Sequence, residues 1–250
     1  MPKDDVLAKY YAEYYADTEL KTTTSNAAYF ARHLMAPMTG LKAAGALRIL
    51  DYGGGDGSVA YAIARRHLDK SGDCDIQIDV VDFEAPRASE EGRITLRGCK
   101  DLGEVGGDYD LILASAVLEH VPQVNAVIRR LAALARPGTY FYARTPFMIP
   151  LARLIGTFDL TYPAHVHDMG SSFWNRFVQT FELQAETIVS RPSLIETTLL
   201  EAPARTIAAF AMKLPSHLEL ALRRPRPTDP IWTLVGGWEV VLRFTGERQG

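Results

Sequence analysis

The sequence has few cysteines, no long apolar segment and no strong excess of charge. Its 250 residues contain two cysteines, Cys74 and Cys99, which are too few for a disulfide framework and show no metal-binding spacing. A formal net charge of −3 argues against a protein that binds nucleic acid by neutralising many phosphates. No apolar run approaches the roughly 20 residues that a membrane-spanning helix needs. We therefore expect neither a nucleic-acid partner nor a membrane partner.

The composition indicates a globular protein of the cytoplasm. Residues 1–5 carry acids and lack the apolar core of a secretory signal, which agrees with the scarcity of cysteine. Apolar residues make up 47% of the chain and charged residues 23%, as in ordinary globular domains. The length suffices for one sizeable α/β domain.

The stretch from Leu47 to Ser58 is the most informative part of the chain. Its apolar first half predicts a short buried parallel strand that ends on Asp51. A glycine cluster follows at once, and the alanine-rich segment 59–67 predicts a helix with basic residues in its last turn. A strand, a glycine turn and a helix in this order begin a nucleotide-binding α/β unit. The glycines of the turn are Gly53, Gly54, Gly55 and Gly57.

The spacing of these glycines distinguishes between nucleotides. A dinucleotide fingerprint needs glycine at its first, third and sixth positions, and Ser58 occupies the sixth. Gly53, Gly55 and Gly57 instead follow an acid-x-Gly-x-Gly-x-Gly pattern that begins at Asp51. This pattern resembles motif I of the class I S-adenosylmethionine-dependent methyltransferases. The resemblance implies S-adenosylmethionine as cofactor and a three-layer Rossmann-like α/β fold. Its sheet would be mainly parallel and seven-stranded, with an antiparallel last strand.

Charge favours the same family. A dinucleotide would bring an anionic pyrophosphate to the helix N-terminus, and the carboxylates of Asp51 and Asp56 would repel it. S-adenosylmethionine carries a sulfonium and an ammonium group and no phosphate, so nearby carboxylates attract it. A glycine turn in an ordinary α/β protein is the alternative interpretation.

Further cofactor contacts are predicted at the ends of the next strands. The second strand, 76–81, ends at Asp82, whose carboxylate can accept hydrogen bonds from both ribose hydroxyls. The alternatives are Glu84 in this role and a purely turn-forming Asp82. Phe83 can lie against the adenine face. In the methyltransferase pattern an acid after the third strand accepts the adenine amino group, which implies that role for Asp101.

A second motif supports the resemblance. The apolar strand 109–115 ends at Ser115 and runs into Ala-Val-Leu-Glu-His-Val at 116–121. This segment resembles the fourth-strand motif of small-molecule methyltransferases that modify quinones and natural products, and it places Ser115 at the cofactor. The resemblance covers residues 45–147. The Asn/Asp-Pro-Pro-aromatic motif of many N-methyltransferases is absent, which counts against a nucleobase or amide acceptor.

Three histidines are candidate catalytic groups. Methyl transfer needs mainly in-line positioning, and a base that takes a proton from a hydroxyl acceptor adds about 10²–10⁴-fold. His120 follows the fourth strand, and His165 and His167 lie on the segment after the fifth. All three could instead have structural roles. The pair at 165 and 167 beside Asp168 suggests a metal, but spacing identifies no third ligand, so we predict no metal site.

The chain is predicted to form one domain. Residues 1–45 would be an N-terminal helical lid, 46–147 the cofactor-binding core, and 148–250 the substrate side with a helical insertion over 190–230. The last strand is placed within 231–244. Further helices are predicted over 26–35, 123–135 and 171–180, and further strands over 94–96, 139–143 and 181–189.

We therefore predict a methyltransferase that acts on a small or medium organic acceptor, with O-methylation favoured. Two other functions are possible. One is a nicotinamide-dependent (NAD(P)) oxidoreductase, which would need a pyrophosphate site. The other is a non-catalytic methyltransferase-like protein that binds the cofactor without turnover. The oligomeric state is left open.

Overall fold

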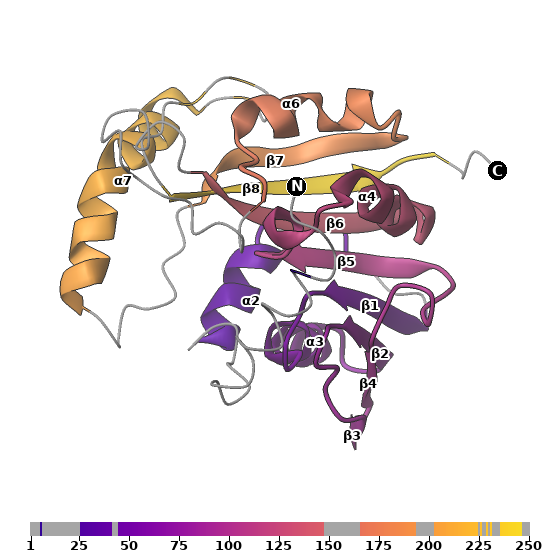
Figure 1. Cartoon of the computed structure of the whole chain (residues 1–250). Coiled ribbons are helices and arrows are strands. Elements are labelled where there is room, and N and C mark those ends of the chain that lie inside the picture. Colours follow the sequence, from indigo (N-terminus) through magenta and orange to yellow (C-terminus); the bar gives the residue numbers. More distant parts are fainter. Residues whose placement is uncertain are drawn as a thin grey trace.

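The computed structural model describes residues 6, 26–41, 45–147, 166–193, 203–224, 226, 229, 231 and 236–246. In these residues one eight-stranded sheet carries helices on both faces (Figure 1). The strands are β1 (Ala46–Tyr52), β2 (Asp75–Val81), β3 (Ser89–Glu91), β4 (Ile94–Cys99), β5 (Tyr109–Ser115), β6 (Ala135–Phe147), β7 (Ala185–Ser193) and β8 (Gly236–Phe244). The helices are α2 (Ala27–Met35), α3 (Ser58–Ser71), α4 (Val124–Ala133), α6 (Ser171–Thr180), α7 (Pro203–Arg223) and the short 3₁₀ turn η1 (Leu118–His120).

The sheet has the order β3-β4-β2-β1-β5-β6-β8-β7. The pairs from β4 through β2, β1 and β5 to β6 are parallel, and β8 is antiparallel to both of its neighbours. The predicted mainly parallel sheet with an antiparallel last strand is thus confirmed. The predicted number of seven strands was wrong by one, because β3 pairs with β4 across a turn at Gly92, where φ is +61°. Its three residues are all exposed, so no apolar pattern marked this strand.

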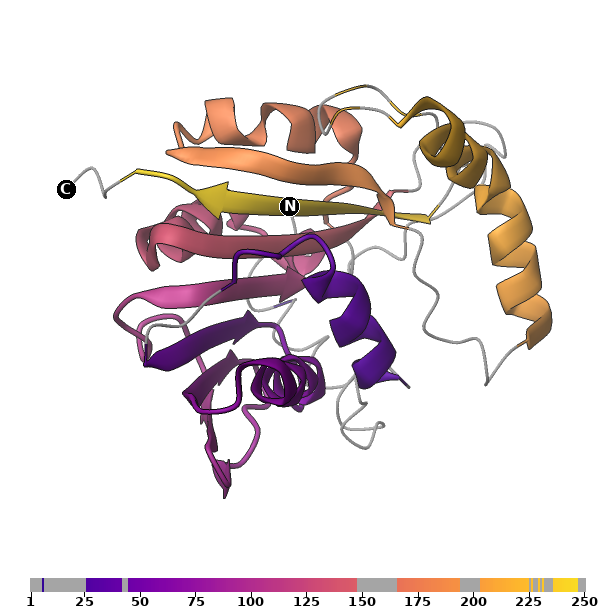
Figure 2. The same cartoon turned by 180° about the vertical axis from the view of Figure 1, so that it is seen from behind.

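The sheet separates two apolar cores, which confirms the three-layer architecture. Helices α2 and α3 cover one face, and α4 and α6 cover the other (Figures 1 and 2). Along β1, Leu47 and Ile49 pack into the core under α2 and α3, whereas Leu50 packs on the opposite side. Alternation of this kind on a central strand leaves both faces apolar, as expected for a parallel sheet buried between helices.

Several predicted boundaries hold. Helix α6 spans the predicted residues, and α2 begins one residue later than predicted, because Asn26 is its N-cap and its side-chain oxygen accepts the Tyr29 N–H at 2.9 Å. The helix predicted over 123–135 was too long, because α4 spans Val124–Ala133 and β6 already begins at Ala135. The ladder between β5 and β6 shifts register near its start, and Gly138 has φ +91°.

The predicted helical insertion over 190–230 starts too early. Residues 190–193 still belong to β7, and the helix α7 begins at Pro203. In Figure 1 α7 stands apart from the sheet, beyond the carboxyl ends of β5 and β6. One stripe of α7 exposes large apolar side chains, with Leu222 81% exposed. The stripe consists of Ile207, Phe210, Leu214, Leu218 and Leu222.

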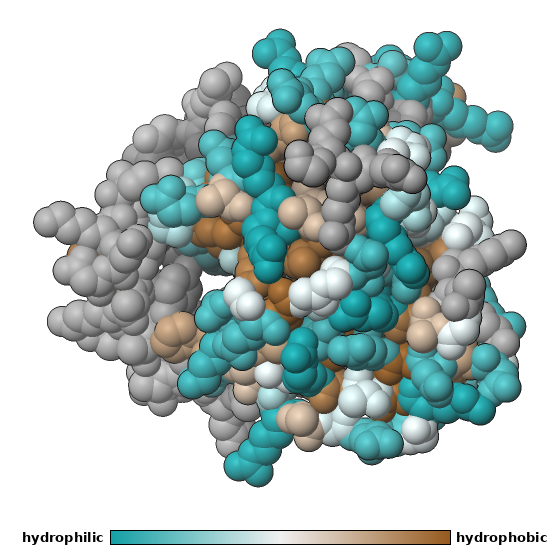
Figure 3. Space-filling view, turned by 90° about the vertical axis from the view of Figure 1, so that its right-hand side faces the viewer, coloured by the Kyte–Doolittle hydropathy of each residue, from teal (hydrophilic) through white to brown (hydrophobic). Residues whose placement is uncertain are grey.

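The opposite end of the molecule has a different surface. Figure 3 shows the face at the amino ends of β5 and β6, where hydrophilic residues dominate and apolar residues form separate patches.

No helix in the described part of the chain is long and apolar enough to cross a membrane. Of the predicted N-terminal lid, α2 is described, while residues 1–5 and 7–25 lie outside the described residues.

Candidate functional site

The glycine turn after β1 has a backbone that only glycine adopts easily. Gly53, Gly55 and Gly57 have φ of +71°, +58° and +75°. The Gly53 N–H donates to the Val81 carbonyl at 2.8 Å, which ties the turn to the end of β2. A β-carbon added at Gly53 would lie 2.3 Å from a methyl carbon of Val117. The turn therefore has no room for side chains on the side that meets the segment after β5.

Asp51 is a buried acid with one oxygen that lacks a partner. The residue is 3% exposed; the Ala60 backbone N–H donates to its carboxyl group, but its Oδ2 has no hydrogen-bond partner among the described residues. Burial, together with the negative charges of Asp82 and Asp56, raises the pKa of Asp51 to about 7. A β-carbon on Gly54 would lie 2.4 Å from the carboxyl carbon of Asp51, so this residue too must be glycine. Such a carboxyl group favours a cationic ligand and disfavours a phosphate.

Asp82 joins the second strand to the glycine turn. Its Oδ2 accepts the Gly55 N–H at 2.9 Å, and its Oδ1 accepts the Glu84 N–H at 3.3 Å. A carboxylate has about four acceptor positions, so further hydroxyl donors can still be accommodated. The neighbouring Phe83 is 59% exposed and thus accessible to a ligand. The structure brings Asp51, the glycines and Asp82 together around one turn.

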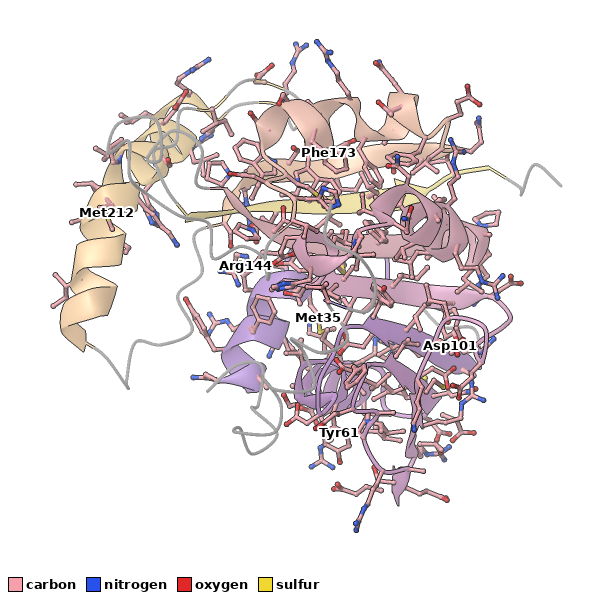
Figure 4. The ribbon with its side chains drawn as sticks, viewed as in Figure 1. Met35, Tyr61, Asp101, Arg144, Phe173 and Met212 are labelled. Atoms are coloured by element: carbon pink, nitrogen blue, oxygen red, sulfur yellow. The ribbon has the colours of Figure 1, made fainter. Side chains whose placement is uncertain are left out.

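Asp101 lies on the exposed turn after β4. Its Oδ1 accepts the Gly103 N–H at 2.6 Å, a contact that shapes the turn itself. Figure 4 labels Asp101 and Arg144 on opposite sides of the molecule. Asp101 is therefore well separated from the end of β6.

The end of β5 bends sharply into η1. Ser115 pairs with Arg144 of β6, and Ala116 follows with the unusual φ of +56°. The Ala116 N–H donates to the Arg144 carbonyl at 2.7 Å, which holds the bend. Val117 then lies against Gly53, so the segment after β5 closes over the glycine turn.

Glu119 in η1 is a second buried acid, and the sequence did not single it out. It is 1% exposed, and its Oε2 has no hydrogen-bond partner among the described residues. Burial raises the pKa of Glu119 to about 7, although the positive charge of Arg144 acts against this rise. His120 Nε2 lies 3.9 Å from Glu119 Oε1, so the imidazole is backed by a carboxyl group. Glutamates are usually exposed, and only the three-dimensional arrangement reveals this burial.

His167 is fixed against the same turn. Its Nε2 lies 2.9 Å from the Val121 carbonyl, to which it can only donate, and its backbone N–H donates to the Glu119 carbonyl at 3.2 Å. A proton held on Nε2 leaves Nδ1 as the basic nitrogen of a neutral ring. His165 lies outside the described residues. Within the described part of the chain, no group of three His, Cys, Asp or Glu residues is placed to hold a metal ion.

A small cavity connects these elements. Its wall includes residues of α2, the glycine turn, β5 and β6, with Asp51 and Arg144 as its charged members. The full lining is Phe30, Leu34, Asp51, Gly53, Gly54, Val59, Leu113, Ser115, Ala116, Tyr142 and Arg144. Sequence reasoning had named Asp51, Gly53, Gly54 and Ser115, but it missed Arg144.

A parallel α/β sheet with a glycine turn after its central strand is typical of domains that bind a nucleoside-containing cofactor at the carboxyl ends of their strands. The model of the methyltransferase domain family matches residues 19–186, about two thirds of the sequence. The chain belongs to the methyltransferase domain family.

Curated relatives match over the same region. The ubiquinone biosynthesis O-methyltransferase of Bordetella avium is 30% identical over 142 residues, which cover 55% of this chain and 58% of the relative. The protein of the same name from Xanthomonas euvesicatoria is 29% identical over 151 residues, covering 59% and 62%. The chain thus spans about three fifths of the length of these relatives.

Solved structures share the fold. The YcgJ protein of Bacillus subtilis superposes with a TM-score of 0.50 at 16% identity, covering 87% of this chain and 99% of that one. An S-adenosylmethionine-dependent methyltransferase from Clostridium acetobutylicum gives a TM-score of 0.50 at 8% identity, covering 97% and 99%. Identities this low establish the fold alone.

Proposed function

We propose that this protein is an S-adenosylmethionine-dependent methyltransferase that methylates a hydroxyl group of a small organic acceptor. The observation that carries the proposal is the buried carboxyl group of Asp51 beside a glycine turn, with an Oδ2 that has no hydrogen-bond partner among the described residues. This arrangement suits a cation and opposes a pyrophosphate. Family membership and the names of the relatives agree with the activity, and those names suggest O-methylation.

The cofactor contacts follow from the turn. Bound S-adenosylmethionine supplies a methyl group on a positively charged sulfur, and Asp51 would attract its positive end. Asp82 would accept the ribose hydroxyls, and Phe83 would lie against the adenine. We keep Asp101 as the acceptor for the adenine amino group. Ser115 would line the site at the end of β5, beside Gly53, Gly54, Gly55 and Gly57.

The chain also offers candidate proton acceptors for a hydroxyl. His120 lies at the carboxyl edge, with the Glu119 carboxyl group 3.9 Å behind it. A carboxylate in this position stabilises the imidazolium that forms when the ring takes a proton. His167 offers Nδ1 as a second candidate, and His165 remains a third. Positioning by the cavity walls would supply most of the rate acceleration.

The proposal extends to the metal content, the compartment and the partner. No metal ion is proposed for the site. The two free, buried cysteines and the moderate net charge support the cytoplasm as the compartment and a small molecule as the partner.

Calorimetric titration tests the proposal. S-adenosylhomocysteine, NADH and NADPH are titrated separately into the full chain. We expect S-adenosylhomocysteine to bind and neither dinucleotide to bind. A screen of catechols and phenols with labelled S-adenosylmethionine then identifies acceptors. Binding of a dinucleotide without S-adenosylhomocysteine binding would refute the methyltransferase and support an oxidoreductase. Cofactor binding without turnover on any acceptor would instead favour a non-catalytic protein.

A further inference from the structure

A row of charged side chains crosses the sheet at its carboxyl edge, on the face that α2 covers. Arg144 of β6 lies opposite Glu239 of β8, and Glu239 lies opposite Arg191 of β7. Tyr142, two residues before Arg144, packs against Phe30 of α2, which fixes the face on which the row lies. Two cations thus flank a single anion.

The charge of Glu239 is already balanced. Its Oε1 lies 2.7 Å from Arg191 Nε, and its Oε2 lies 2.7 Å from His33 Nε2. Although burial acts to raise the pKa of Glu239, His33 and Arg191 outweigh it and lower that pKa. Glu239 therefore stays ionised, and its two oxygens are bound by partners other than Arg144.

Arg144 is the cation of this row that Glu239 does not bind, and its charge acts at longer range on Glu119. Its Nε donates to the Ser193 hydroxyl at 3.1 Å, which orients the guanidinium. In the described part of the chain its two terminal nitrogens make no hydrogen bond and have no carboxylate within 4.0 Å. An oriented guanidinium with two free terminal nitrogens is suited to bidentate binding of a carboxylate.

The position of Arg144 indicates which ligand it meets. It lines the same small cavity as Asp51, Gly53 and Ser115, so one cavity contains a carboxyl group and a guanidinium. Figure 4 shows Arg144 at the end of β6 next to α2. Opposite charges in one small cavity are complementary to the ammonium and carboxylate groups of an amino acid.

We propose that Arg144 is a carboxylate receptor for this cavity, and that it binds the carboxylate on the amino-acid tail of the cofactor. This inference rests on the proposed function. An anionic group on the acceptor is the other possible source of a carboxylate, because Arg144 also lies beside the end of β5, where the acceptor must approach.

The first arm of the test compares two ligands that differ in one carboxylate. They are S-adenosylhomocysteine and its decarboxylated analogue, 5′-S-(3-aminopropyl)-5′-thioadenosine. Calorimetry should show that the wild-type protein prefers S-adenosylhomocysteine by roughly 10- to 100-fold, as expected for a charge-assisted hydrogen bond. Arg144→Met should bind both ligands equally, and Arg144→Lys should restore part of the preference. Arg176→Met, an exposed arginine on α6, is the matched control and should retain it.

The second arm tests the acceptor as the source. With the protein saturated with S-adenosylhomocysteine, 4-hydroxybenzoate and 4-hydroxybenzamide are titrated into the wild type and Arg144→Met. In one outcome, the wild type prefers 4-hydroxybenzoate over the amide and Arg144→Met loses this preference, while the preference for S-adenosylhomocysteine over its decarboxylated analogue is the same in both proteins. This result would show that Arg144 binds a carboxylate of the acceptor and not that of the cofactor. If Arg144→Met showed the same ligand preferences as the wild type with both pairs of ligands, the proposal would be overturned. If the wild type failed to bind S-adenosylhomocysteine at all, the proposed function would be wrong instead.

Discussion

The buried carboxyl group of Asp51 predicts that the affinity for a cationic cofactor depends on pH. With its pKa raised to about 7 by burial and by Asp82 and Asp56, this group is mostly protonated at pH 6. A cation binds well only to the ionised form. Cofactor affinity should therefore rise as the pH increases through 7 and become constant above pH 8.

The magnitude follows from the fraction of Asp51 that is ionised. At pH 6 about one molecule in ten carries the charge, so affinity should be about tenfold lower than at pH 8. At pH 5 the loss should approach about a hundredfold. An acid with the ordinary pKa of 3.8 would give almost no change over this range.

Titration calorimetry with sinefungin, a stable analogue whose amine replaces the sulfonium, measures this dependence between pH 5.5 and 8.5. Asp51→Asn should bind sinefungin weakly at every pH, and its affinity should no longer change with pH. Asp69→Asn, at an exposed position on α3, is the matched control and should behave like the wild type. A wild-type affinity that does not change between pH 6 and 8 would refute this account of Asp51.

Three further predictions concern the glycine turn, Asp51 and the candidate proton acceptor His120. Gly53→Ala should abolish S-adenosylhomocysteine binding in the calorimetric assay because the added methyl group clashes with Val117. The double variant Gly53→Ala with Val117→Ala should recover part of the binding. Equal loss in both variants would exclude the clash as the cause. Asp51→Asn should raise the melting temperature at pH 8 but not at pH 4. The raised pKa of the folded state makes the wild type lose stability as the pH rises from about 4 to 7, by up to about 4 kcal/mol. Equal melting temperatures of Asp51→Asn and the wild type at pH 8 would contradict the raised pKa of Asp51. His120→Gln should lower turnover about 10²–10⁴-fold with little change in cofactor affinity, and full activity would assign the proton transfer elsewhere.

The cofactor half of the site could be predicted from sequence because its determinants are local. An apolar strand, an acid and glycines at fixed spacing lie within twelve residues, and their geometry depends little on the rest of the chain. Asp82 was found for a similar reason, since parallel strands end at the same edge of a sheet. Strand β5 contains the continuous apolar run 111–114, which is typical of a strand buried on both faces.

The rest of the site could not be predicted in this way. The row formed by Arg144, Glu239 and Arg191 joins three strands that are distant in the sequence, and its register depends on antiparallel pairing. The burial of Glu119 likewise depends on the bend at Ala116 and on the segment at 166–167 that covers η1. Strand β3 escaped prediction because three exposed polar residues carry no apolar periodicity.

A crystal structure of the full chain with S-adenosylhomocysteine would show directly whether the cofactor binds at the glycine turn. We predict the ribose hydroxyls within hydrogen-bond distance of the Asp82 carboxylate and the amino group beside Asp51. The sulfur should face the end of β5 at Ser115. A cofactor bound away from the turn at 53–57, or no bound cofactor at saturating concentration, would contradict the account.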